Sequence, residues 1–170
     1  MAKGHNSYPD TDSRMLRGYT PKFPDPPLLP KSVNSLLLVK RIQVLAEGVM
    51  DATALLFFEQ QRETPSEPWS SRQLRKIAGG LRDLNVRIEQ KEFFVDDCFS
   101  LADISVASVL GMQDMLEQTG VASGLQSMAP SIVDWRAKYP LLERFYTQLS
   151  MRPSVKSTAP MMFELSETVV

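Results

Sequence analysis

Apolar side chains recur every three to four residues over most of the chain, which is the period of an amphipathic α-helix. Between Asn34 and about Arg62 there is no proline, and the pattern predicts one long helix with Asn34 or Ser35 as its N-cap. One face of this helix is apolar throughout and carries Leu38, Ile42, Leu45, Val49, Ala52 and Leu56.

A second amphipathic helix is predicted from about Trp69 to Gln90, after a break at Thr64–Pro68. Its apolar positions are Leu74, Ile77, Leu81, Leu84 and Ile88. Gly79 and Gly80 lower helix propensity in the middle of this segment, so we expect both to permit close packing of a neighbouring helix.

A third helix has a distinctive start in residues 99–104, which read Phe-Ser-Leu-Ala-Asp-Ile. Ser100 and Asp103 have the spacing of a capping box, in which Ser100 accepts from the Asp103 amide and the Asp103 carboxylate accepts from the Ser100 amide. Phe99 and Ile104 then stand at the positions of a hydrophobic staple. We interpret Ser100 and Asp103 as a structural cap, not as an active-site pair, and expect the helix to end near Glu117.

Two shorter helices are predicted over residues 131–138 and 141–150, followed by a last turn over residues 152–158. No segment shows the alternation of a β-strand. The sequence therefore predicts an all-α fold, a helical bundle.

Prolines divide the chain further. Six of the twelve lie in residues 1–33, which we interpret as an extended Pro-rich arm before a helical domain at 34–160 and a tail at 161–170. Part of the arm, residues 23–30, is apolar enough to lie along a surface and cover it.

Charge and cysteine content narrow the function classes. The chain has 19 basic and 20 acidic residues in 170, so we expect neither nucleic acid nor a membrane as a partner. The single cysteine, Cys98, excludes an internal disulfide and, without a signal peptide or an apolar run long enough to span a membrane, favours the cytoplasm. We expect Cys98 to be buried, His5 to lie in the arm, and no metal site to be present.

The chain resembles the C-terminal helical domain of glutathione transferases of the bacterial and fungal branches. The resemblance covers about residues 28–160 and rests on four segments in the family's order and spacing: residues 28–30, 46–52, 99–105 and 134–140 continuing to 152–154. In that family a preceding thioredoxin-like domain supplies the catalytic residue and holds glutathione. Here a Pro-rich arm precedes the linker, so we expect no cofactor and regard glutathione binding as doubtful. Members of that family commonly dimerise through the first two helices, so the resemblance implies a homodimer.

Candidate site residues follow partly from this resemblance. Glu47 and Asp51 lie one turn apart on the first helix and, with Tyr146, are candidate catalytic groups; the alternative is a solvated helix face on which they pair with Lys40. Residues that could line an apolar, adaptable pocket are Gln43, Met50, Phe58, Met112, Met115, Leu116, Met161, Met162 and Phe163, although core or dimer packing would explain the same methionines.

Two function classes remain open from the sequence. The first is a protein that binds an apolar small-molecule metabolite and catalyses a glutathione-independent isomerisation, cyclisation or elimination. The second is a non-catalytic docking module, or one half of a transferase that depends on a partner chain. An exposed apolar face would serve either class.

Overall fold

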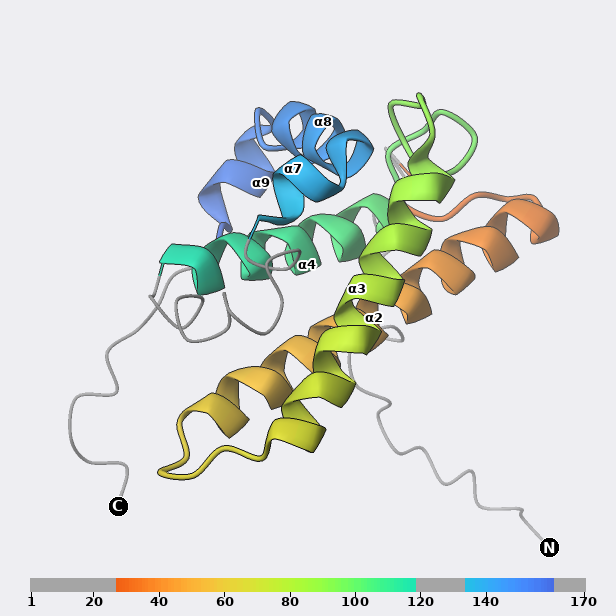
Figure 1. Ribbon diagram of the computed structural model, residues 1–170. Helices are drawn as coiled ribbons and strands as arrows, with labels where there is room; N and C mark the ends of the chain where they lie inside the picture. Colours follow the sequence, from red (N-terminus) through yellow and green to blue (C-terminus); the bar gives the residue numbers. More distant parts are fainter. Residues whose placement is uncertain (1–26, 119–133, 161–170) are drawn as a thin grey trace, which may run out of the picture.

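The computed structural model describes residues 27–118 and 134–160, and these contain helices but no strand (Figure 1). An isolated bridge between Val95 and Cys98 is the single β-type pairing within those ranges. The helices are α2 (Val33–Gln60), α3 (Glu67–Ile88), α4 (Leu101–Gln118), α7 (Trp135–Lys138), α8 (Pro140–Leu149) and α9 (Pro153–Ser157). The prediction of an all-α fold is confirmed.

Helices α2 and α3 form a long antiparallel pair (Figure 1). Their facing sides are apolar, with Ile42 and Val49 of α2 and Ile77 and Leu81 of α3 all buried. Gly80 allows the two helices to approach closely, because a Cβ there would overlap the Val49 side chain. Gly79 has nothing within 4 Å of the same position, so the expectation that both glycines permit packing is wrong for Gly79.

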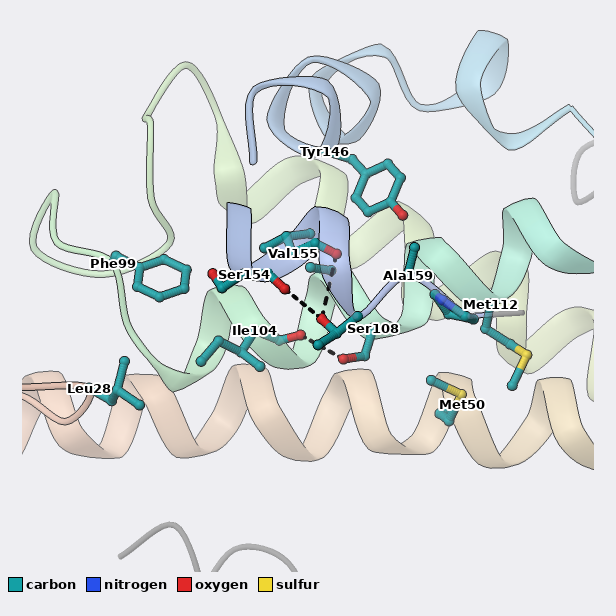
Figure 2. Close-up of a pocket in the computed structure, with 13 residues that line it drawn as sticks. Leu28, Met50, Phe99, Ile104, Ser108, Met112, Tyr146, Ser154, Val155 and Ala159 are labelled. Atoms are coloured by element: carbon teal, nitrogen blue, oxygen red, sulfur yellow. Dashed lines mark hydrogen bonds between the residues drawn. The ribbon is translucent and has the colours of Figure 1, made fainter. Parts of the chain in front are cut away.

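Helix α4 packs beside α2, and the short helices α7, α8 and α9 gather beside α4 (Figures 1 and 2). One continuous core joins these elements, and its largest fully buried side chains include Trp135, Phe145, Leu110 and Leu142. Tyr139 ties this part to α3, because its hydroxyl donates to the Ala78 carbonyl at 3.1 Å. None of the helices within the described ranges combines the length and the apolar character needed to cross a membrane.

The start of α4 is fixed by Asp103, which is fully buried. Its carboxylate accepts from the Ser100 amide at 2.7 Å, as the spacing predicts, and also from the Ser100 hydroxyl at 2.8 Å and the Phe94 amide at 2.9 Å. The reciprocal bond differs from the prediction, because the Asp103 amide donates to the Ser100 carbonyl and not to its hydroxyl. The carboxylate therefore joins the preceding loop to the helix.

The residues just before α2 also contact α4. The Leu28 carbonyl accepts from the Leu101 amide, the first of α4, at 3.0 Å, so this end of the arm lies against the bundle. Residues 1–26 of the predicted arm and the tail at 161–170 lie outside the described residues.

Two local expectations are wrong. The N-cap of α2 is Ser32, not Asn34 or Ser35. Cys98 is exposed, not buried. It follows a tight turn in which Asp96 and Asp97 both have positive φ, 54° and 50°, a conformation that aspartate tolerates better than most residues. The turn leaves Cys98 at the surface beside Pro30 and Lys31.

Candidate functional site

A cavity of about 390 Å³ lies between α2, α4 and α9 (Figure 2). Helix α4 forms its floor, because Ile104, Ser108 and Met112 stand four residues apart and point to one side. Leu28 and Phe99 lie at one end, and Met50 and Met112 lie at the other (Figure 2). The full lining is Leu28, Met50, Phe99, Ile104, Ala107, Ser108, Met112, Tyr146, Ser154, Val155, Thr158, Ala159 and Pro160.

Tyr146 contributes the aromatic hydroxyl to this cavity from α8. Its ring meets the edge of the Trp135 ring at a centroid distance of 6.0 Å, and the Arg136 guanidinium lies 5.4 Å from its centroid. Asp114 holds both neighbours, accepting from the Trp135 indole at 3.0 Å and from Arg136 at 2.6 Å. The position of Tyr146 is therefore set by packed and bonded groups.

The pKa of the Tyr146 phenol lies above its usual value of 10.0. Burial is the largest cause, and the nearby Asp114 carboxylate raises the pKa further, while Ser150 and Arg136 offset part of the rise. Tyr146 is accordingly a neutral hydrogen-bond donor at physiological pH, not a base.

Phe99 forms the opposite wall, and two neighbours fix its ring. The Arg152 guanidinium carbon lies 4.0 Å from the ring centroid, and the Phe93 ring meets it edge-on at 6.0 Å. Ser108 cannot offer a free donor, because its hydroxyl already bonds the Ile104 carbonyl at 2.9 Å. The lining thus combines an apolar surface with few polar groups and no carboxylate, which suits binding and orientation more than acid–base chemistry.

Three of the residues proposed from the sequence, Met50, Met112 and Tyr146, line this one cavity. The other two catalytic candidates do not: Glu47 and Asp51 are exposed on α2. Gln43 is buried beside them and links its own helix, accepting from Lys40 at 2.7 Å and donating to Glu47 at 2.9 Å. Glu47 is thus part of an intrahelical ladder.

The remaining pocket candidates lie elsewhere. Phe58 is 66% exposed and belongs to a separate open groove with Leu55 and Trp69 at the turn between α2 and α3. Leu116 is buried in the interior, and Met115, although partly buried, does not line the cavity. Met161, Met162 and Phe163 lie outside the described residues.

Several lining residues were not identified from the sequence as pocket residues. Phe99 and Ile104 were assigned to a local staple, yet both also face the cavity. Ser108 could have been found, since it lies midway between Ile104 and Met112 on the same helical face. Val155 and Ser154 carry no such signal, because the placement of α9 depends on contacts distant in sequence.

Among the described residues, no group of three or more histidine, cysteine, aspartate or glutamate side chains could hold a metal ion. The exposed thiol of Cys98 lies in a smaller hollow with Lys31 and Asp96, apart from this cavity.

Comparison with known proteins gives the context for this cavity. Residues 45–153 match the family model of the glutathione S-transferase C-terminal domain. No match was found among curated proteins.

Among solved structures, a glutathione S-transferase from Methylobacterium radiotolerans in complex with glutathione sulfonate is 35% identical, with a TM-score of 0.78 over 93% of this chain and 69% of that one. One from Methylobacillus flagellatus with GSH bound is 30% identical, with a TM-score of 0.77 over 89% and 70%. A family member from Pseudomonas fluorescens with bound S-(propanoic acid)-glutathione is 28% identical, with a TM-score of 0.70 over 90% and 72%.

These complexes correct one expectation from the sequence. The chain was expected to have no cofactor, with glutathione binding in doubt, but these similar structures were crystallised with glutathione or its derivatives. The expectation was based on the composition of the Pro-rich arm. Composition does not show which ligand proteins with a similar helical domain bind.

Proposed function

Because this chain belongs to the glutathione S-transferase family through its C-terminal domain, we propose that it binds an apolar small molecule beside a glutathione site. The observation that carries the proposal is the cavity of about 390 Å³ between α2, α4 and α9. Its size and its apolar walls with few polar groups are typical of small-molecule sites.

The lining also favours a substrate of variable shape. Met50 and Met112 have flexible, polarisable side chains that adapt to different apolar surfaces. Phe99 offers an aromatic wall, which favours a flat or aromatic ligand. The phenol of Tyr146 is the polar group that would orient such a ligand, by donating a hydrogen bond.

Of the three catalytic candidates, we retain Tyr146 alone, in an orienting role. Glu47 and Asp51 are exposed and outside the cavity lining, and they have no part in this proposal. The glutathione-independent reactions considered from the sequence are replaced by a glutathione-dependent one, because the similar structures are complexes with glutathione and its derivatives.

A fluorescence titration tests the proposal. N-phenyl-1-naphthylamine is a neutral aromatic probe whose emission rises in an apolar site, and we expect it to bind the wild-type protein. Ser108→Phe should fill the cavity from its floor and weaken probe binding about tenfold or more, which corresponds to about 1.4 kcal/mol.

Ser157→Phe is the matched control, since Ser157 is exposed on α9 and outside the lining. It should leave probe affinity unchanged. Equal affinity of Ser108→Phe and wild type would show that the probe binds elsewhere and would overturn the proposal. Titrations repeated with glutathione present test the second ligand, and we expect probe and glutathione to bind together, not to compete.

Exposed apolar side chains on one side of α2 support a second proposal, self-association. Val33, Leu37, Val44 and Leu55 lie on one side of this helix and are between 44% and 69% exposed. Val44→Lys should shift the protein towards the monomer in sedimentation velocity. Met151→Lys, a change at a residue that is 77% exposed but away from this face, should not. A wild-type monomer at all accessible concentrations would overturn this proposal and leave the cavity proposal intact.

A further inference from the structure

One glycine of α4 determines how closely the last described residues approach the cavity. Gly111 is buried, and a Cβ built on it would lie 2.9 Å from Pro160 Cδ, 3.1 Å from Pro160 Cγ and 3.0 Å from the Tyr146 hydroxyl. Real Cβ contacts are essentially never shorter than 3.0 Å. Tyr146 and Pro160, the two residues that a side chain at Gly111 would meet, both line the cavity. Because glycine has no side chain, both can lie directly on α4.

Other helical glycines of the described chain have different surroundings. Gly48 and Gly79 would meet nothing within 4 Å, and Gly80 packs against Val49 at the contact of α2 with α3. Among these glycines, Gly111 is therefore the one whose close neighbours line this cavity. A glycine inside a helix costs about 0.5–1 kcal/mol relative to alanine, so this contact comes at the expense of helix stability.

We propose that Gly111 is a specificity-determining residue, which limits the length of the ligand by letting residues 158–160 close one end of the cavity against α4. This inference rests on the proposed function, since it concerns the same cavity. The ligand class it implies is a compact apolar molecule, with longer homologues excluded.

The two neighbours of Gly111 would respond differently to a methyl group. Tyr146 is buried and held by Trp135 and by Arg136, which Asp114 fixes in turn. Pro160, the last described residue, is exposed, so less of its surface is packed against groups that would resist its displacement. An alanine at position 111 should therefore displace Pro160 and leave the phenol in place.

Displacement of Pro160 would lengthen the cavity at one particular end. Ala159 lies close to Met112 at the end opposite Leu28 and Phe99 (Figure 2). Thr158 and Pro160 line the cavity with Ala159, so moving residues 158–160 away from α4 should extend the apolar space along the helix.

Binding of a homologous series of n-alkylbenzenes tests this inference, measured by displacement of N-phenyl-1-naphthylamine from the full chain. For the wild type, affinity should rise about fourfold with each added methylene until the chain reaches the closed end, and then stop rising. In Gly111→Ala the rise should continue for at least one further methylene, so that the longest ligands bind about fourfold more tightly than to wild type.

Two further variants keep the test decisive. Gly79→Ala, which adds the same methyl group to a helix without a close neighbour, should keep the wild-type length limit. Pro160→Ala removes the ring atoms that contact Gly111, and it should lengthen the limit without any change in α4.

The outcomes distinguish failure of this inference from failure of the proposed function. An unchanged length limit in both Gly111→Ala and Pro160→Ala would overturn this inference, as would a uniform loss of affinity across the series. Failure of every member of the series, and of the probe, to bind wild type would overturn the proposed function itself.

Discussion

The two halves of α4 bury polar groups in different ways. Near its start, the Asp103 carboxylate is fully buried and accepts three hydrogen bonds, from the Phe94 amide and from the amide and hydroxyl of Ser100. In its second half, Gln113 is 2% exposed and donates to the Thr53 hydroxyl at 2.8 Å, but its amide oxygen has no partner within the described part of the chain.

Helix α3 offers a still stronger contrast. Gln73 is fully buried, and neither its amide nitrogen nor its amide oxygen has a partner among the described residues. A buried polar group without a partner costs about 1–3 kcal/mol, whereas a bonded one contributes about 1 kcal/mol net. On this basis the loop-to-α4 junction should stabilise the fold, while the unpartnered amide of Gln73 should reduce its stability.

Of the variants that test this contrast, Asp103→Ala should change the free energy of unfolding most. The variant loses three hydrogen bonds and leaves the buried Phe94 and Ser100 amides without an acceptor, so we expect the free energy of unfolding to fall by about 3 kcal/mol. Urea denaturation followed by circular dichroism measures the change. Glu117→Ala, at an exposed position late in the same helix, should stay within about 0.5 kcal/mol of wild type. A loss below about 1 kcal/mol for Asp103→Ala would show that the junction is not a stabilising site.

Gln73→Met should act in the opposite direction. Methionine has nearly the shape of glutamine but no polar amide, so the variant removes an unpartnered buried group and keeps the packing. We expect the free energy of unfolding to rise by about 1 kcal/mol, measured in the same way. Gln90→Met, an exposed change just after α3, serves as the control. If Gln73→Met destabilises the protein, the amide has a partner, such as an internal water, and the contrast with Asp103 fails.

The difference between these regions also explains which parts of the fold could be predicted. The bond between Ser100 and Asp103 joins residues three apart, so its spacing is visible in the sequence. The bond between Thr53 and Gln113 joins residues 60 apart, and no local pattern indicates it. Helix periodicity is equally local, which is why the long helices were predicted well and only their ends and caps were displaced.

The candidate site shows the same limit. Met50, Met112 and Tyr146 were proposed from composition and from the resemblance, and they line one cavity. Phe58 was proposed on the same grounds, but it lies near the C-terminal end of α2, at the turn that leads to α3 (Figure 1). The sequence gives the direction of a side chain and its height along its own helix, but not which neighbouring element lies there to meet it. Leu116 was assigned to the pocket in error, because the sequence does not show which elements surround that side of α4.

The pH dependence of stability tests the environment of the Asp103 carboxyl. Burial raises the pKa of its carboxyl above the usual 3.8, and hydrogen bonds from Phe94 and Ser100 offset part of the rise. Between the unfolded and the folded pKa the folded protein therefore binds more protons than the unfolded chain. The associated stability is fully present below 3.8 and is lost as the pH rises through the folded pKa.

Asp103→Ala lacks this titration, whereas the other carboxyl groups are common to both proteins and largely cancel. The difference in free energy of unfolding between wild type and Asp103→Ala should therefore shrink as the pH rises from below 3.8, by about 1.4 kcal/mol for each unit that separates the two pKa values. Urea titrations of both proteins across this range measure it. A difference that grows with pH would mean that the three hydrogen bonds outweigh burial and hold the folded pKa below 3.8, so that the junction favours the charged carboxylate outright.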